Sequence, residues 1–181
     1  FVAGVKKQGG ALGARIVDEV KCHLLVIEIR RGLKQLGEHD GCIQKPEQRC
    51  PPLLGIGEVE DFFECVERGA DMFDCVAPTR IARNGGLHTK QGKINIKNSE
   101  HRESLDPIES DCGCYTCKSY TRSYLSHLFR SDEMLAGTLA SIHNLYFINK
   151  LVEDIRQSLI NENFYEFKEQ FLKDYYKEKT L

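Results

Sequence analysis

Three cysteines lie close together, in the segment Cys112-Gly-Cys114-Tyr-Thr-Cys117. The sequence shows no secretory signal, and without one clustered cysteines indicate metal ligands rather than a disulfide framework. A thiolate-rich site favours zinc, and a structural zinc takes four tetrahedral ligands. Three histidines are near enough in the sequence to supply the fourth ligand: His101, His127 and His143. His143 follows Leu139 by one turn of a predicted helix, so we expect its side chain to face inward.

Asp74 is a second candidate for chemistry. It lies near the end of a short run, residues 71–76, that is predicted to be a buried strand. Strand alternation places Met72 and Asp74 on one face and Cys75 on the other. A carboxylate at the C-terminal end of a barrel strand lies where barrel enzymes have their active sites, although a turn-capping aspartate is the alternative. Cys75 has no basic partner nearby in the sequence, so we predict that it packs rather than reacts.

Arg80 and Arg83 follow Asp74 within the segment 78–85. The planar guanidinium suits phosphate and base-edge recognition, although two surface arginines on a loop would look the same. Residues 78–102 carry six Lys or Arg against one acid, whereas residues 58–74 carry seven acids against one arginine. This asymmetry indicates a polyanion contact beside an acidic site, and two solvated faces are the alternative.

The elements that must position Asp74 and the arginines are two short strands and a helix. Residues 53–57 and 71–76 are predicted strands, and residues 58–68 between them have helical spacing, with Gly69 just past the end. Such a βαβ unit builds parallel sheets and barrels. Residues 87–89 and 93–96 are predicted to form a hairpin around the Lys90-Gln-Gly92 turn.

Three helices are predicted for the rest of the chain: 116–129, 132–160 and 163–176. Ser131 is the expected N-cap of the second helix. The third presents a row of aromatic residues on one face, which is typical of a core or an interface: Phe164, Phe167, Phe171 and Tyr175.

The composition is that of an ordinary globular protein, with 41% hydrophobic and 29% charged residues in 181. The sequence has no apolar run of about 18 residues, so we expect no membrane span. The first ten residues lack the apolar core of a signal peptide, and we therefore expect a cytoplasmic protein. The chain begins at Phe1 rather than Met, which is compatible with a piece of a longer protein.

Five motifs occur in a specific order: Gly55-Ile-Gly57, residues 68–85 around Asp74, Asn95-Ile-Lys-Asn98, the cysteine segment 112–117, and Ile142-His-Asn144. From about Leu53 to near the C-terminus, this series closely resembles the queuine-type tRNA-guanine transglycosylases of bacteria. The resemblance implies an enzyme of queuosine biosynthesis that exchanges guanine for a 7-deazaguanine at the wobble position of the tRNA anticodon. It also implies a homodimer in the full-length protein.

The resemblance also implies roles for individual residues. Asp74 matches the nucleophile, which attacks the ribose C1′ and displaces guanine through a covalent intermediate, as in a retaining glycosidase. Thr79, Arg80 and Arg83 match positions that hold the anticodon loop. Four residues match the zinc ligands: Cys112, Cys114, Cys117 and His143. Gly9 and Gly10 are candidates for the Gly-Gly-Leu loop of the family that binds the base.

The expected fold class is α/β: the C-terminal portion of a (β/α)8 TIM barrel with a zinc-binding subdomain and C-terminal helices. Residues 1–52 match the family poorly and are a candidate barrel remnant. Residues 53–103 would supply the last strands and helix of the barrel with the active-site loop, and residues 104–181 the zinc-binding subdomain and helices. A complete barrel needs about 250 residues, so we predict that this chain alone is inactive.

Two other functions compete with this interpretation. One is a noncatalytic, zinc-containing, tRNA-binding or partner subunit of the same family. Relatives of that kind usually lose the nucleophile, so the presence of Asp74 and both arginines favours the enzyme. The other is an unrelated zinc-ribbon interaction module, which would leave the whole block from Asp74 to Gly85 unexplained.

Overall fold

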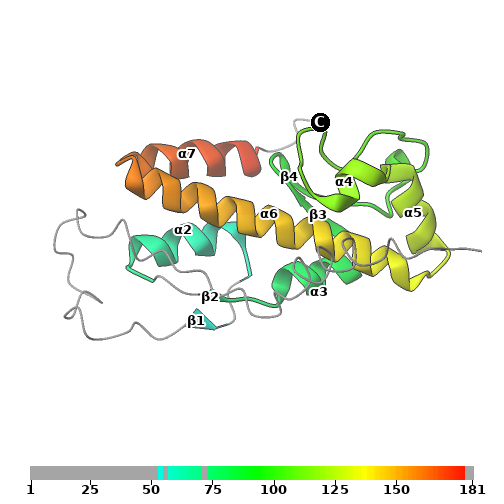
Figure 1. Cartoon of the computed structure of the whole chain (residues 1–181), viewed down its shortest axis with the longest axis horizontal. Coiled ribbons are helices and arrows are strands. Elements are labelled where there is room, and N and C mark those ends of the chain that lie inside the picture. The colour runs from blue at the N-terminus through cyan, green and yellow to red at the C-terminus, as the bar shows by residue number, and fades with distance from the viewer. Residues whose placement is uncertain (1–52, 55–56, 71–72, 178–181) are drawn as a thin grey trace, which may run out of the picture.

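The computed structural model describes residues 53–54, 57–70 and 73–177 (Figure 1). The candidate base-binding residues Gly9 and Gly10, and the whole segment 1–52, lie outside the described residues. The same is true of Met72, so only part of the predicted alternation around Asp74 can be followed.

The first described elements form the predicted βαβ unit. Strands β1 (Leu53–Leu54) and β2 (Phe73–Asp74) are parallel, and helix α2 (Val59–Glu67) connects them. The Asp61 carboxylate accepts a hydrogen bond from the Glu58 backbone N–H at 3.1 Å, which satisfies an amide at the start of the helix. The chain leaves α2 through Gly69, whose φ of 86° suits glycine as predicted for the end of the helix. Among the described residues of the two predicted strands, residues 57, 75 and 76 are not in a strand.

A short helix, α3 (Ala77–Arg83), follows β2 directly. It begins with a proline in its first turn, where no intrahelical N–H bond is lost, and it ends before Gly85 (φ 88°). Arg80 and Arg83 therefore lie on a helix rather than on a loop. Seven residues are too few for a helix that is stable alone, so its position depends on tertiary contacts.

The predicted hairpin is confirmed. Strand β3 (Gly86–Thr89) pairs antiparallel with β4 (Gly92–Asn95), and Leu87 lies opposite Ile94. The Thr89 hydroxyl donates to the Gly92 carbonyl at 2.7 Å, and this bond closes the turn. The 3₁₀ helix η1 (Ser99–His101) follows.

The prediction of one helix over residues 116–129 was wrong. Two helices occupy this region, α4 (Tyr115–Ser119) and α5 (Arg122–Arg130). Tyr120 is extended, and the Thr121 hydroxyl oxygen accepts a hydrogen bond from the Tyr124 N–H at 3.2 Å, so Thr121 caps a new helix.

The predicted N-cap of the following helix was also wrong. Helix α6 (Met134–Ile160) is preceded by Glu133, whereas Ser131 ends α5. Between them Asp132 has a φ of 56°, a left-handed conformation that stops α5 and redirects the chain.

Helix α6 runs along the described part of the molecule (Figure 1). It contributes to two hydrophobic cores. One core lies between α2, α6 and α7 (Phe164–Tyr175), and Phe63 contacts three rings of α7 there, with centroids 5.6 to 6.3 Å apart. The aromatic face of α7 is therefore core. The other core joins the hairpin, α4, α5 and the first turns of α6. No helix in the described part of the chain has the length and hydropathy of a membrane span.

Candidate functional site

Helices α4 and α6 bring the three cysteines and one histidine together. Cys114 caps α4, and its sulfur accepts a hydrogen bond from the Cys117 N–H at 3.3 Å. The Nδ1 atom of His143, on α6, lies 3.8 Å from the Cys112 sulfur, 3.6 Å from that of Cys114 and 3.4 Å from that of Cys117. All four potential ligand atoms lie within 4.8 Å of one another. The group could hold a metal ion.

The size and chemistry of this group fit zinc. Tetrahedral zinc, with bonds of about 2.0 Å to nitrogen and about 2.3 Å to sulfur, places its ligand atoms about 3.5 to 3.8 Å apart. The three distances from His143 to the sulfurs lie close to this range. Three soft thiolates with one imidazole favour zinc among common divalent metals. Four protein ligands would leave no open position, which is typical of a structural site.

The orientation of His143 is fixed from its other side. Its Nε2 atom lies 2.7 Å from the carbonyl oxygen of His88, and because a carbonyl only accepts, Nε2 must carry the proton. The lone pair of a neutral ring would then be on Nδ1 and would face the sulfurs. Burial lowers the pKa of His143, but the Cys112 and Cys117 sulfurs and the His88 carbonyl outweigh burial and raise it to about 10. A metal ion that binds at Nδ1 would therefore displace a proton from this nitrogen.

The two alternative histidines lie elsewhere. His101 is buried on η1, and its Nε2 lies 3.3 Å from the Glu100 carboxylate. His127 is exposed on α5. Within the described residues, His143 is the histidine that completes the cysteine group.

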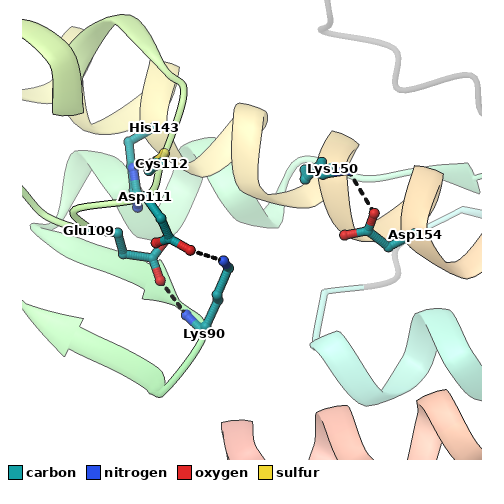
Figure 2. Close-up of polar contacts among 7 residues, drawn as sticks. All are labelled: Lys90, Glu109, Asp111, Cys112, His143, Lys150 and Asp154. Atoms are coloured by element: carbon teal, nitrogen blue, oxygen red, sulfur yellow. Dashed lines mark hydrogen bonds and ion pairs between the residues drawn. The ribbon is translucent and has the colours of Figure 1, made fainter.

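Two acidic residues beside the group contact the hairpin turn. Figure 2 shows Lys90 between them: its backbone N–H donates to Glu109 at 2.6 Å, and its ammonium group pairs with Asp111. Burial raises the pKa of Glu109. These contacts attach the loop that leads to Cys112 to the end of the hairpin.

Asp74 ends β2, opposite Leu54 of the parallel partner strand, and is partly exposed. Phe73 and Cys75 on either side are buried in the core with α6. This burial pattern agrees with the predicted alternation, and the prediction that Cys75 packs is confirmed by its place in the core. Burial also raises the pKa of the Cys75 thiol, which disfavours the thiolate.

Helix α3 presents the other candidate residues close to Asp74 in the chain. Arg80 and Arg83 are exposed, and among the described residues no carboxylate forms an ion pair with either. The Thr79 hydroxyl donates to the Val76 carbonyl at 3.0 Å, which holds it at the start of the helix.

Two of the six cations between residues 78 and 102 are paired with acids of the described part of the chain. Lys90 pairs with Asp111, as described above, and Lys93 pairs with Glu58. Lys97 lies over the Phe129 ring at 5.4 Å from its centroid. Arg80 and Arg83 on α3 are therefore better placed than Lys90 and Lys93 to meet an anion.

Sequence reasoning missed the role of Asn144. This fully buried side chain donates to the Pro78 and Gly86 carbonyls, each at 3.0 Å, and accepts from the His88 N–H at 3.0 Å. The sequence did contain a signal for this role, because Asn144 follows the inward-facing His143 on an apolar helix. A buried amide there requires hydrogen-bond partners.

Sequence reasoning also missed His88. Its Nδ1 lies 2.7 Å from the Tyr175 hydroxyl, and its ring stacks on Phe147. Burial, with smaller effects from Lys93 and His143, lowers its pKa to about 4, so the ring is neutral at pH 7. His88 thus joins the hairpin to the last turn of α7.

Comparison with known proteins identifies the family. The family model described as Queuine tRNA-ribosyltransferase matches residues 39–177. The chain belongs to the queuine tRNA-ribosyltransferase family. The matched residues of this family member include Asp74, helix α3 and all four residues of the cysteine–histidine group.

Several curated queuine tRNA-ribosyltransferases are similar to the chain. One from Caldanaerobacter subterraneus subsp. tengcongensis is 50% identical over 131 residues, which cover 72% of this chain and 35% of that protein. One from Vibrio atlanticus is 47% identical over 148 residues, which cover 82% of this chain and 39% of that protein. One from Streptococcus mutans is 46% identical over 130 residues, which cover 72% of this chain and 34% of that protein. The chain thus spans little more than a third of the length of these queuine tRNA-ribosyltransferases.

Proposed function

We propose that the chain is the C-terminal part of a tRNA-guanine transglycosylase, which exchanges guanine for a 7-deazaguanine at the wobble position of tRNA in queuosine biosynthesis. The names of its relatives support a ribosyltransferase that acts on tRNA. The main structural support for the proposal is the position of Asp74 relative to α3. The Asp74 carboxylate lies at the end of a parallel strand, and α3, with two exposed arginines, begins three residues later.

In this proposal β1, α2 and β2 belong to a (β/α)8 barrel. Residues 53–103 would supply its last strands and helix with the active-site loop, and residues 104–181 the metal-binding subdomain and C-terminal helices. Residues 1–52 would be a remnant of the barrel, with Gly9 and Gly10 in the loop that binds the base. The parallel pairing of β1 with β2 supports this arrangement, because parallel strands joined by a helix are the repeating unit of such a barrel.

Asp74 would act as the nucleophile. Its carboxylate oxygen attacks the ribose C1′, the bond from C1′ to N9 of guanine breaks, and its electron pair leaves with the base. N9 of the incoming deazaguanine then attacks C1′ from the vacated side and breaks the ester to Asp74, which restores the carboxylate. The proton gained by the departing guanine is balanced by the proton lost from the incoming base, and two displacements retain the configuration at C1′.

Thr79, Arg80 and Arg83 would hold the anticodon loop. The exposed guanidinium groups can each form paired hydrogen bonds to a phosphate, and the Thr79 oxygen retains the capacity to accept a hydrogen bond. Because α3 starts three residues after Asp74, phosphates bound there would be close to the attacked ribose.

Zinc is the proposed metal at Cys112, Cys114, Cys117 and His143. When bound, it would cross-link α4 to α6 and contribute folding energy rather than a reactive water. We further propose a cytoplasmic enzyme that forms a homodimer when full-length. Exposed apolar side chains at the start of α6 support an interface there: Met134 and Leu135.

An exchange assay tests the proposal in a complete barrel. A chimera would carry this chain in place of the matched segment of the Caldanaerobacter relative, and the incorporation of labelled guanine into tRNA would be measured. We expect the chimera to be active and Asp74→Asn to abolish exchange. Asp132→Asn is the matched control, because Asp132 is exposed and asparagine suits its φ of 56°. A stably folded but inactive chimera would favour the noncatalytic partner subunit.

Binding of an anticodon stem-loop tests the role of α3 separately. Replacing Arg80 and Arg83 by alanine should weaken binding and reduce the slope of log K against log salt by about 1.4, at about 0.7 for each lost phosphate contact in single-stranded RNA. The control replaces two exposed lysines near the C-terminus, Lys173 and Lys177. Equal effects from the two pairs would mean that α3 is only a solvated surface.

A further inference from the structure

Asn144 connects three separate elements through one side chain. Both hydrogens of its amide are used, one by the Pro78 carbonyl in the first turn of α3 and one by the Gly86 carbonyl at the start of β3. Its oxygen accepts from the His88 N–H within β3. The side chain is fully buried, so none of these bonds is exchanged with water.

The neighbouring residue of α6 binds the same strand. His143 donates to the His88 carbonyl at 2.7 Å, while Asn144 accepts from the His88 N–H at 3.0 Å. Consecutive side chains of α6 therefore hold both backbone polar groups of one residue. A displacement of the metal-binding group would be transmitted to β3, and through Asn144 to α3.

Helix α3 packs against α6 beside these contacts. The helix has only seven residues and packs along α6, where Gly137 lies beside Arg83: a Cβ atom built on Gly137 would lie 3.6 Å from Cγ of Arg83, an ordinary van der Waals contact. Its inner face is apolar at Ala82, which is fully buried. In this interface the Asn144 amide donates a hydrogen bond to the Pro78 carbonyl in the first turn of α3. This turn is the part of α3 that is nearest to Asp74 in the sequence.

We infer that Asn144 is a positioning residue, which sets the placement of α3, and so of Arg80 and Arg83, relative to the metal-binding group. The inference rests on the proposed function, since it assumes that the two arginines bind RNA. Asn144 touches no substrate and acts through α3.

A double-mutant cycle measures this role. The zinc-loaded chain would be titrated with an anticodon stem-loop as wild type, as Asn144→Ala, as Arg80→Ala/Arg83→Ala, and as the triple variant. Asn144→Ala should weaken RNA binding on the order of tenfold in the wild-type background and less than about twofold in the double-arginine background. Its zinc content should equal that of Asn149→Ala, an exposed asparagine on the same helix. A purely structural defect would weaken binding equally in both backgrounds.

A second variant separates the bonds to α3 from general destabilisation. Asn144→Asp retains the shape and the acceptor for the His88 N–H but loses the amide donors to Pro78 and Gly86. It should weaken RNA binding as Asn144→Ala does, measured against Asn149→Asp, which carries the same added charge.

Each remaining outcome is decisive. Three results would overturn the inference: wild-type RNA affinity in either Asn144 variant, an additive cycle, or loss of zinc from both variants. Loss of zinc would mean that Asn144 stabilises the packing of the whole fold. If the double-arginine variant binds RNA as tightly as the wild type, the proposed RNA site itself is wrong. The cycle therefore distinguishes failure of the inference from failure of the proposed function.

Discussion

The most specific structural prediction is that His143 is the fourth ligand of the cysteine–histidine group. The substitution His143→Ala tests this prediction. This ring is the one ligand from α6, whereas the three cysteines all lie in or beside α4. Its removal would leave three thiolates and break the cross-link between the two helices. It would also remove the hydrogen bond to the His88 carbonyl.

The expected magnitude has two parts. The free energy of zinc binding in zinc-finger peptides is about 10 to 16 kcal/mol, which is about 3 kcal/mol for each of four ligands. Loss of the His143 ligand should therefore weaken zinc binding on the order of 100-fold. Independently of the metal, the loss of a fully buried ring and of one buried hydrogen bond should cost about 2 to 4 kcal/mol of unfolding free energy. Since the ring is completely buried, solvent cannot replace these contacts.

Competition with a chromogenic zinc chelator would measure the affinity, and thermal unfolding with and without zinc would measure the stability. We expect His143→Ala to lose zinc to a chelator concentration that leaves the wild type intact, and to unfold at nearly the same temperature with or without zinc. His127→Ala, on the exposed face of α5, is the matched control and should behave as the wild type. Full zinc retention in His143→Ala, or zinc loss in His127→Ala or His101→Ala, would refute this assignment of the fourth ligand.

Two further predictions concern the surrounding fold. Tyr175→Phe removes the hydroxyl that lies 2.7 Å from the buried His88 ring, so it should lower the unfolding free energy by about 1 to 3 kcal/mol in a denaturant titration; an unchanged midpoint would contradict the bond. Gly86→Ala would place a Cβ atom 2.5 Å from Cγ2 of Ile81, so it should destabilise the protein, and Ile81→Ala in the same chain should recover part of the loss; no recovery would mean that this contact is not the cause.

The sequence predicted those elements whose signals are local. The helical spacing of apolar residues in 58–68, followed by Gly69, predicted the helix of the βαβ unit. The turn that includes Gly92 predicted the hairpin. The prediction failed where two helices adjoin with the same periodicity. Tyr120 and Thr121 interrupt the predicted helix because Thr121 is the N-cap of a second helix, α5. Ser131 was predicted to begin α6, but it is the C-cap of α5, because a serine can occur at either end of a helix.

The contacts around the metal group could be predicted only in part. The spacing of the cysteines indicated the site, since three ligands lie in one short segment. Asn144, by contrast, bonds to partners 56, 58 and 66 residues away, and no local pattern gives such distances. The helical state of α3 was missed for the same reason, because so short a helix is stabilised by packing on α6 rather than by its own sequence.

A covalent adduct with tRNA tests most directly the proposed role of Asp74 as the nucleophile. The chimera described above would be incubated with tRNA while the incoming base is limiting, then denatured and separated on a gel that resolves free tRNA from tRNA bound to protein. A ribosyl ester survives denaturation, so we predict an adduct with the wild type and with Cys75→Ala, and none with Asp74→Asn. Zinc content and tRNA affinity should be the same in all three proteins. An adduct in Asp74→Asn, or its loss in Cys75→Ala, would contradict the assignment.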